Sequence, residues 1–577
     1  EFSGYQIFAV RIPTNTQKRI ADYEAAHGEF TVTRQRLRVY TNREVVKIVD
    51  DLGNDDVGGL IGYLNSTNVS KSYALGDVTG SDSVGALIGE HNSGTLSESF
   101  AAGTPIGTTN VNAAIGVETG GTINDIYYNS SYNTETAGSA TGLTDSVLKG
   151  SLPTNFVGAD WFQMTNRTYP LLKVFAETIC FENPGWTAFN ASGAGTVSDP
   201  YLICNYNQLN DIDTNEPGSL VFHYKLAADI SLHAGKLTHA SLGSNGVPFT
   251  GSFDGNQHLI RGGVTMVYEH EGIIKNLFLE NFSKSTTSSN KGLLANYSDN
   301  GVTLNNHVFG DLTSTTGTTS LLIGRQYGRD IVVNNTAYGS INSFSSGGGI
   351  VGYASSNSFI YKSKVFANQF TFSYGSGGVV GRNSHHTIKN KAFGTLSGTQ
   401  DIGGIVGLHG NGDFSLTNQN ITSLDLNVTG DRIGGLIGYG TNTSFTPYIM
   451  NNMAINFNID GDSTASTVGG LYGFKAVASY NLTNNTFSNI AAETGGIAGY
   501  SSASGFGNFW NENNGITDWE DAGGEIAGQY EGLDFSNDDH KVLATFTAAS
   551  WDMVDVWAMS DGIRGPHLRW DLHPVCQ

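Results

Sequence analysis

Short apolar clusters flanked by glycine and followed by a polar run recur along the chain. "VGGLIGYLNS" (57–66) returns as "VGALIGEHNS" (84–93) after 27 residues, and "VNAAIGVETG" begins another 27 residues later at Val111. The aromatic residues Tyr73, Phe100 and Tyr127 keep the same register. Two short β-like segments per period, separated by turn residues, predict that each period forms one coil of a β-solenoid.

Stacking of such coils explains which residue types recur. Successive coils stack at about 4.8 Å, so that equivalent positions lie directly above one another. We expect an inward apolar stack of Leu60, Leu87 and Ala114. We expect the glycines of the same strings at corners, where a Cβ would be crowded or φ is positive: Gly62, Gly89 and Gly116. No helix pattern follows these strings and they recur, which argues against a phosphate-binding loop.

A second, longer series of the same strings runs from about 290 to 500. Its clearest members are "GGIVGYA" (348–354), "GGVVGRN" (377–383), "GGIVGLH" (403–409) and "GGLIGYG" (434–440). The spacing varies between neighbouring strings, which predicts insertions in the turns on one side of the solenoid. Loops of this kind often carry binding faces.

These strings resemble the GLUG motif of bacterial secreted and cell-surface proteins. "GGLIGY" and "GGIVGY", followed by "SYALGDVTG" (72–80) in the first series, carry the resemblance, which covers roughly 57–130 and 180–577. It implies an all-β protein with a right-handed parallel β-helix or β-solenoid, and an adhesin-like or other surface role. It implies no catalytic residues.

Two matching segments indicate where each series closes. "WFQMTNRTYPLLKVF" (161–175) and "VWAMSDGIRGPHLRW" (556–570) share Trp, Met and a proline near leucine. We expect both to be C-terminal caps that cover the last rung, whose strand edges would otherwise be unpaired. The predicted organisation is a small α+β cap or docking segment (1–55), a first solenoid with its cap (56–178), a lead-in or N-terminal cap (179–265) and a second solenoid with its cap (266–577).

Charge and cysteine content narrow the expected binding partners and the expected location of the protein. The 577 residues contain 75 glycines, and the formal net charge is −22. So acidic a chain disfavours binding to nucleic acid or to an anionic membrane surface, and no apolar run is long enough for a membrane span. We expect a disulfide between Cys180 and Cys204, with Cys576 left over, although other pairings are open. A disulfide would fit a secreted or cell-surface protein.

Candidate chemistry is sparse. Trp510 and Trp519 could stack on sugar rings, while nearby carboxylates act as acid and base: Glu512, Asp518, Glu520 and Asp521. A loop before the closing segment is the favoured interpretation of this stretch. His385 and His386 are adjacent and would point to opposite strand faces, so a shared metal is disfavoured. We expect no cofactor, apart from a weak case for structural Ca²⁺ at Asp-rich turns.

The leading hypothesis is therefore a secreted or cell-surface structural or adhesive β-solenoid, able to assemble head-to-tail into a filament. Its expected partners are other copies of itself, surface glycans or other surface proteins. The alternative from a different class is a carbohydrate-active β-helix enzyme, a polysaccharide lyase or hydrolase. A passive stalk is a third hypothesis.

Overall fold

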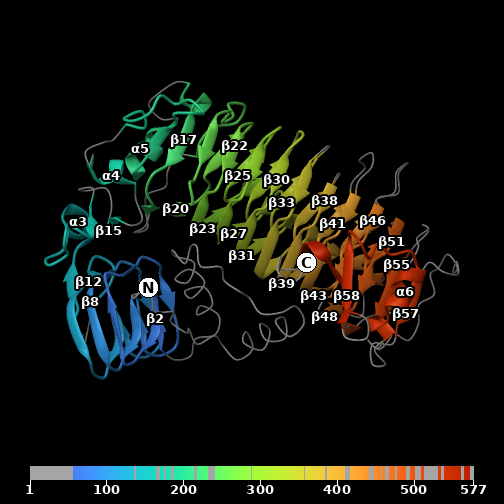
Figure 1. The fold of residues 1–577 in the computed structure, drawn as a ribbon, viewed down its shortest axis with the longest axis horizontal. Helices are drawn as coiled ribbons and strands as arrows, with labels where there is room; N and C mark the ends of the chain where they lie inside the picture. Colours follow the sequence, from blue (N-terminus) through green and yellow to red (C-terminus); the bar gives the residue numbers. More distant parts are fainter. Residues whose placement is uncertain are drawn as a thin grey trace. The chain divides into compact units, whose positions relative to one another are not determined.

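Strands that lie one sequence repeat apart pair in parallel throughout the computed structural model (Figure 1). It describes residues 56–571, except 135–137, 164–168, 174–176, 183–187, 213–217, 232–240, 288, 356–357, 384–385, 410–415, 441–447, 456–457, 462–466, 475–476, 486, 489–493, 501–507, 512–529, 534–538 and 561–563. Strands account for 53% and helices for 7%, in a parallel β-solenoid of about 13 turns. The predicted all-β parallel solenoid is confirmed, whereas the predicted α+β segment (1–55) lies outside the described residues.

The chain forms two compact units. The first contains residues 1–187, 204–208 and 227–237, and the second contains 188–203, 209–226 and 238–577. The rungs of the first unit comprise β1 (Val57–Gly58), β2 (Ile61–Leu64), β3 (Thr67–Ser70), β4 (Tyr73–Ala74), β5 (Val78–Thr79), β6 (Val84–Gly85), β7 (Ile88–His91), β8 (Gly94–Ala101), β9 (Pro105–Ile106), β10 (Val111–Asn112), β11 (Ile115–Glu118), β12 (Thr122–Asn129) and β13 (Thr141–Leu143).

The register of the first unit follows the 27-residue period. Val84 pairs with both Val57 and Val111, and Phe100 pairs with both Tyr73 and Tyr127. Leu87 and Ala114 are fully buried, and Leu60 packs against the same cluster, so the predicted apolar stack is confirmed. A Cβ on Gly89 would lie 2.4 Å from a backbone carbon of the neighbouring rung. Crowding at the corner, rather than positive φ, therefore explains this glycine.

A hairpin closes the first unit along its side. It consists of β14 (Trp161–Phe162) and β15 (Leu171–Leu172), which pair antiparallel. The Trp161 ring contacts the rings of Tyr73 and Phe100 at centroid distances of 6.1 Å each, and these two residues belong to successive rungs. The segment thus lies across the outer face of several rungs. The predicted C-terminal cap therefore extends beyond the last rung, because its large apolar side chains pack on an aromatic column drawn from successive rungs.

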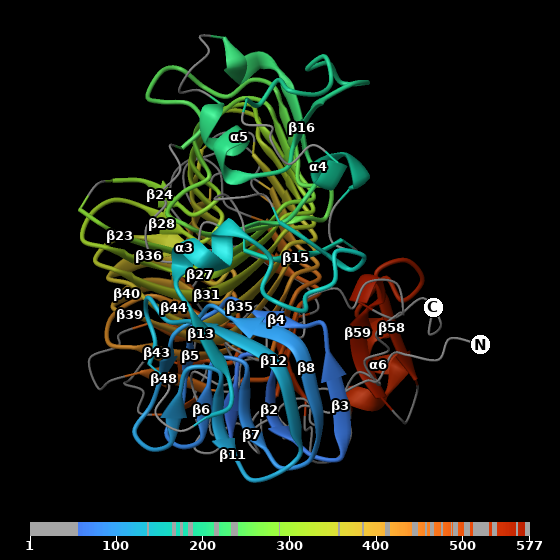
Figure 2. The ribbon, with the colours of Figure 1, turned by 90° about the vertical axis from the view of Figure 1, so that its left-hand side faces the viewer.

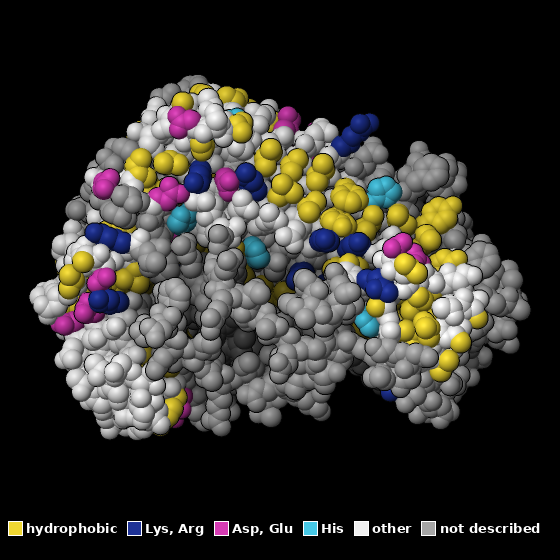
Figure 3. All heavy atoms as spheres, viewed as in Figure 1, with side chains coloured by type: hydrophobic (Ala, Val, Ile, Leu, Met, Phe, Trp, Pro, Cys, Tyr) yellow, Lys and Arg dark blue, Asp and Glu magenta, His cyan; other side chains and the backbone are white. Residues whose placement is uncertain are grey.

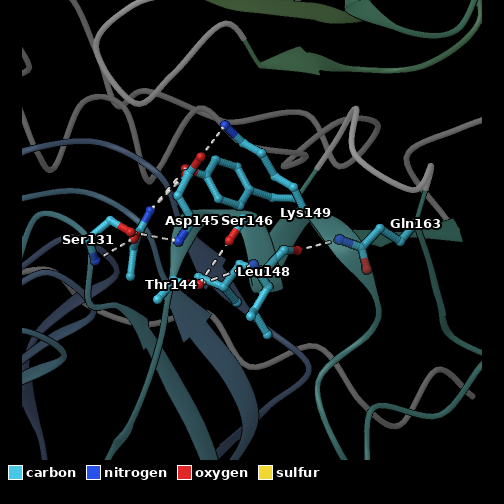
Figure 4. Close-up of polar contacts among 10 residues, drawn as sticks. Ser131, Thr144, Asp145, Ser146, Leu148, Lys149 and Gln163 are labelled. Carbon is cyan, nitrogen blue, oxygen red and sulfur yellow. Dashed lines mark hydrogen bonds and ion pairs between the residues drawn. The ribbon is translucent and has the colours of Figure 1, made fainter.

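Helix α3 (Asp145–Gly150) is fixed beside this hairpin by a buried polar cluster (Figure 4). The Asp145 carboxylate accepts hydrogen bonds from Tyr169 Oη at 2.5 Å and Asn129 Nδ2 at 3.0 Å, and pairs with Lys149 Nζ at 2.9 Å. Burial opposes ionisation of Asp145, but these partners lower its pKa overall. Both carboxylate oxygens have protein partners, which indicates an anchoring role.

From β22 onward, most rungs of the second unit pass through four parallel sheets in turn, and Figure 2 shows their strands behind one another. Sheet 1 contains β16 (Tyr201–Ile203), β17 (His223–Leu226), β19 (Ser252–Asp254), β22 (Ile273–Lys275), β26 (Val302–Leu304), β30 (Ile331–Val333), β34 (Phe359–Tyr361), β38 (His386–Ile388), β42 (Leu416–Asn418), β46 (Tyr448–Met450) and β51 (Val477–Ser479). The predicted lead-in (179–265) thus already supplies three strands of this sheet.

The remaining sheets complete each rung. Sheet 2 contains β20 (Leu259–Gly263), β23 (Phe278–Thr286), β27 (His307–Ser314), β31 (Thr336–Ser343), β35 (Lys364–Thr371), β39 (Lys391–Gly398), β43 (Ile421–Val428), β47 (Met453–Ala454), β48 (Asn458–Gly461), β52 (Leu482–Thr483), β53 (Phe487–Ser488), β56 (Asn508–Asn511) and β57 (Tyr530–Leu533). Sheet 3 contains β21 (Val267–His270), β25 (Ala295–Ser298), β29 (Ile323–Gln326), β33 (Val351–Ala354), β37 (Val380–Asn383), β41 (Val406–His409), β45 (Ile437–Gly440), β50 (Tyr472–Phe474) and β55 (Ala498–Tyr500). Sheet 4 contains β24 (Lys291–Gly292), β28 (Thr319–Ser320), β32 (Gly347–Gly348), β36 (Tyr374–Gly377), β40 (Gln400–Gly403), β44 (Ile433–Gly434), β49 (Val468–Gly469) and β54 (Thr494–Gly495).

A ladder of buried asparagines stacks at the corner between sheets 1 and 2. The ladder consists of Asn306, Asn335, Asn390, Asn420, Asn452, Asn481 and Asn508, all fully buried, with Ser363 in the place of one asparagine. The residue before each position adopts positive φ in most rungs, for example Asn334 at 55° and Gln419 at 55°. This left-handed turn aims the following side chain into the corner, where it can reach the adjacent rungs.

Each ladder amide satisfies backbone groups that the corner would otherwise leave unpaired. Asn420 Nδ2 donates to the Thr387 carbonyl at 2.8 Å, and Asn420 Oδ1 accepts from the backbone N–H of Asn390 at 2.9 Å. Buried peptide groups without a partner are costly. The ladder therefore lets the chain turn a sharp corner without losing backbone hydrogen bonds.

A disulfide bond joins Cys180 and Cys204. Cys180 lies in α4 (Thr178–Glu182), and Cys204 lies between β16 and α5 (Tyr206–Asp211). Both cysteines are buried. Their separation of 24 residues defines a closed loop whose constraint on the unfolded chain stabilises the fold by about 3 kcal/mol. Cys576 lies outside the described residues.

The C-terminal segment also lies on the side of its solenoid. It contains α6 (Leu543–Ala548), β58 (Trp557–Ser560) and β59 (Arg564–Leu568), preceded by η4 (Asp539–Lys541) and followed by η5 (Arg569–Asp571). Its aromatic residues pack with a column of sheet 2 side chains drawn from successive rungs: Ile421, Met453, Leu482 and Phe509. Here too the segment covers a lateral apolar column, so that the predicted C-terminal cap extends over several rungs and not the last one alone.

Candidate binding surface on the solenoid

Sheet 3 presents one outward side chain per rung, at the third position of its strand, which follows a glycine in most rungs. In β33, Val351 and Ala354 are fully buried, whereas Tyr353 between them is half-buried. Strand register places the equivalent residues directly above and below it. We call the seven central members of this set the tyrosine–arginine column, and they are Tyr297, Arg325, Tyr353, Arg382, Leu408, Tyr439 and Phe474. Glu269 and Tyr500 occupy the equivalent positions at its two ends.

Rings and guanidinium groups alternate along the middle of the column. Arg325 Cζ lies 4.7 Å from the ring centroid of Tyr353 and 4.7 Å from that of Tyr327, which is 44% exposed. Arg382 Cζ lies 5.3 Å from the Tyr353 centroid on the other side. Cation–π contacts of this kind hold the guanidinium planes against the rings. The Arg325 Nε is buried without a hydrogen-bond partner, so any contact of this residue with a ligand would be made by the terminal nitrogens of its guanidinium group.

The charges of this surface are only partly neutralised within the chain. Arg432 lies over the Tyr439 ring at 4.2 Å and pairs with Asp401 at 2.6 Å. In contrast, Arg325 and Arg382 form no ion pair or hydrogen bond in the part of the chain that the structure describes. Carboxylates outnumber basic residues in this chain, 52 to 30. Two neighbouring cations without a carboxylate partner therefore suggest a ligand that supplies negative charge.

The column has the dimensions of a site for an extended ligand. Seven rungs at about 4.8 Å give a length of about 29 Å. Burial raises the pKa of Tyr327, so its phenol is neutral at pH 7 and can donate a hydrogen bond. The ring faces of the column are occupied by guanidinium groups and neighbouring rings, so the ring edges, the phenol hydroxyls and the arginine forks are the groups that can meet a ligand. Arginine forks bind carboxylate or sulfate groups in bidentate fashion. The surface thus suits a linear anionic glycan.

The predicted glycan contacts are not part of this surface. Trp510 lies in β56, is 8% exposed, and its ring packs where a Cβ on Gly496 would come within 2.2 Å. A tryptophan buried inside the rung cannot stack on a sugar at the surface, so its proposed glycan contact was wrong. Trp519 and the carboxylates of the enzyme hypothesis, Glu512, Asp518, Glu520 and Asp521, lie outside the described residues, and that hypothesis stays a prediction.

Other candidate chemistry stays open or lies elsewhere. His386 is half-buried on sheet 1, while His385 lies outside the described residues. Within the described residues, no group of three or more His, Cys, Asp or Glu side chains is arranged to hold a metal ion. The structural Ca²⁺ expectation is untested. No helix among the described residues has the length and apolar content needed to cross a membrane.

The sequence contains a signal for the tyrosine–arginine column, in the residue that follows the glycine of most sheet 3 strands. The residue after the glycine of the sheet 3 strand is Arg in "IGRQ" (323–326) and "VGRN" (380–383), and Tyr in "VGYA" (351–354) and "IGYG" (437–440). The apolar pattern of the repeat predicts which residues are buried, and it does not predict the role of this position. Only the strand register shows that these side chains face outward in one line.

Comparisons with known proteins give limited similarity. No family model matches the chain. A segment covering 31% of the chain is 30% identical, over 212 residues, to halomucin of Haloquadratum walsbyi, of whose length it spans 2%. A crystal structure from Bacteroides ovatus, described as a candidate immunoglobulin A1 protease, aligns with 66% of this chain and 94% of its own, at 19% identity and a TM-score of 0.28.

Proposed function

We propose that this protein is a non-catalytic, adhesive β-solenoid of the cell surface or extracellular space, and that it binds acidic glycans along the tyrosine–arginine column. The observation that carries the proposal is the pair Arg325 and Arg382, held by aromatic rings without a carboxylate partner in the described chain. A rigid sheet presents these groups at fixed spacing, which reduces the entropy that binding would cost.

Three observations support the location outside the cell. The Cys180–Cys204 disulfide is a kind of bond that persists in oxidising compartments. The glycine strings resemble the GLUG motif of secreted and surface proteins. The partial similarity to halomucin points in the same direction. Head-to-tail assembly stays a prediction, which electron microscopy tests, since fibres would support it and short rods would contradict it.

Glycan binding is tested by titrating the purified full chain with an immobilised polyuronate, a sulfated polysaccharide and a neutral glucan. We expect binding to the anionic polymers that weakens with salt, because ion pairs at the surface are screened. The double variant Arg325→Gln/Arg382→Gln should weaken this binding at least tenfold, because each lost charge-assisted contact contributes about 1.5–3 kcal/mol.

A matched control removes the same charge elsewhere. Lys362 and Lys389 occupy the left-handed corner position between sheets 1 and 2, with φ of 52° and 57°. The equivalent residue in the next rung is Gln419, with φ of 55°, so Lys362→Gln/Lys389→Gln introduces a side chain that this corner already accepts. We expect this control to bind within twofold of the wild type. Equal loss in both double variants would show non-specific charge attraction and contradict the proposal.

A further inference from the structure

The two arginines of the tyrosine–arginine column lie on alternate rungs. Strand register places Tyr353 on the rung between Arg325 and Arg382. The flanking positions of the column are Tyr297 and Leu408, which carry no charge. Two rungs at about 4.8 Å set the arginine positions about 9.6 Å apart. Positive charge along this stretch therefore alternates with uncharged rungs.

The spacing matters because basic side chains are sparse in this chain. Lys and Arg make up 30 of the 577 residues, and Figure 3 shows them dispersed among neutral side chains on the face that it draws. A broad basic surface attracts polyanions of any pattern, whereas separate cations discriminate by the position of each partner charge. We therefore expect the spacing of Arg325 and Arg382 to select the ligand.

The rung between the arginines offers a neutral hydrogen-bonding group. The Tyr353 ring is held between the two guanidinium groups, whose Cζ atoms lie 4.7 Å and 5.3 Å from its centroid. Its hydroxyl forms no hydrogen bond within the part of the chain that the structure describes, and a phenol hydroxyl can both donate and accept. Tyr353 can therefore meet a hydroxyl or amide group of an uncharged sugar.

A sugar chain lying along the column would meet it rung by rung. A sugar of an extended polysaccharide is about as long as the rung spacing, so each sugar lies beside one rung. Alternating acidic and uncharged sugars then set one anionic group at each arginine and an uncharged sugar at Tyr353. With an acid on every sugar, three anionic groups on these rungs would share two guanidinium groups, and like charges on neighbouring sugars would repel one another.

We propose that the glycan bound by the column is a polymer of a two-sugar unit, in which one sugar carries a carboxylate or sulfate group and the other is uncharged. The inference rests on the proposed glycan binding and specifies its ligand. The smallest complete ligand is an acidic–neutral–acidic trisaccharide, which covers the rungs of Arg325, Tyr353 and Arg382.

The two ends of the column limit this pattern differently. Glu269 lies two rungs before Arg325, so an acidic sugar there would meet a like charge. Two rungs beyond Arg382 lies Tyr439, and the Arg432 guanidinium lies over its ring at 4.2 Å. Arg432 follows the same alternation, although its charge is balanced by an ion pair. The anionic pattern therefore extends from Arg325 toward Tyr439.

The test compares two soluble polymers, at equal concentration of carboxylate groups, by isothermal titration calorimetry of the full chain. Hyaluronan alternates an acidic and an uncharged sugar, whereas polygalacturonate carries an acid on every sugar. In about 0.15 M salt, which screens long-range attraction, we expect the Kd per carboxylate to be at least threefold lower for hyaluronan, because its acidic groups do not crowd one another at the arginines.

A position swap separates spacing from net charge. Tyr353→Arg/Arg382→Tyr keeps the composition of the chain but brings the arginines onto adjacent rungs. Only one acidic sugar of the alternating polymer can then meet an arginine, so hyaluronan binding should weaken at least tenfold and the preference over polygalacturonate should vanish. Tyr353→Phe removes only the hydroxyl and should weaken hyaluronan binding about two- to tenfold.

The outcomes separate this proposal from glycan binding itself. Circular dichroism confirms that each variant is folded, and Tyr353→Phe gives the answer if the swap is not. The proposal is overturned if the wild type binds both polymers equally well per carboxylate, if the swap keeps the wild-type affinity for hyaluronan, or if Tyr353→Phe does. Binding to neither polymer would instead contradict the proposed function.

Discussion

Replacing Asn420 with leucine tests whether the buried ladder holds the corner together. The Asn420 amide donates to the Thr387 carbonyl at 2.8 Å and accepts from the Asn390 N–H at 2.9 Å. Leucine is of similar size and offers neither group, so the bond to the Thr387 carbonyl and the bond from the Asn390 N–H would both be lost in a buried corner. At about 2 kcal/mol for each group, Asn420→Leu should lower the free energy of unfolding by about 4 kcal/mol.

Asn418→Leu is the matched control for this change. Asn418 lies two residues earlier, on the outward side of β42, is half-buried, and accepts one side-chain hydrogen bond from Asn451 at 3.1 Å. The same chemical substitution there should cost less than 1 kcal/mol, because water can replace the lost contact. The comparison separates loss of the ladder from the general effect of leucine in a strand.

Two measurements report on the ladder. Urea unfolding followed by tryptophan fluorescence gives the global free energy, and amide hydrogen exchange reports local opening in a repeat structure where rungs can open separately. A cost of about 4 kcal/mol corresponds to roughly a thousandfold faster exchange at the Asn390 amide. If Asn420→Leu lies within 1 kcal/mol of Asn418→Leu, and the Asn390 amide stays protected, the reasoning about the corner is refuted.

Three further predictions concern stability. Ser363→Asn should raise the unfolding free energy by about 1 kcal/mol in the same urea assay, because Ser363 Oγ accepts only a 3.3 Å bond from Asn335 where other rungs carry a full amide; a loss of stability would contradict the ladder's periodicity. Burial raises the pKa of Asp330 from 3.8 to about 6, so the folded state binds this proton more tightly than the unfolded state. The stabilisation that protonated Asp330 gives to the folded state is present below about pH 4 and is lost as the pH rises through 6. Between pH 7 and pH 4 the wild type should therefore gain about 2.4 kcal/mol of stability relative to Asp330→Asn, and a pH-independent difference would exclude this titration. Cys204→Ser should lower the melting stability by about 3 kcal/mol without reductant, and the difference from wild type should vanish in dithiothreitol.

The repeat fixed by glycine and apolar residues was predictable because it concerns the inside of the rungs. Val57, Val84 and Val111 pair as their 27-residue spacing indicates. The outer faces were not predictable in the same way. A segment such as "IVV" (331–333) is apolar at every position, and without the register its exposed residues cannot be told from buried ones.

The asparagine ladder and the closing segments were likewise only partly predictable from the sequence. Asn–Asn pairs at 305–306, 334–335 and 451–452 recur where the chain turns into sheet 2, yet asparagine is common in turns and the insertions vary the spacing. The closing segments were recognised from Trp and Pro, but their contacts depend on which sheet carries an uncovered apolar column. That information is held in residues far away in sequence, such as Ile421 and Phe509.

The lateral attachment of the C-terminal segment determines how the solenoid would carry mechanical load. Trp570 Nε1 donates to the Gln419 carbonyl at 3.0 Å, and Asp571 pairs with Lys391, whose Nζ lies 5.1 Å from the Trp570 ring centroid. Tension applied beyond Asp571 would therefore enter the stack at the rungs of Lys391 and Gln419. The later rungs, including the one at Phe509, would therefore carry little of the applied load.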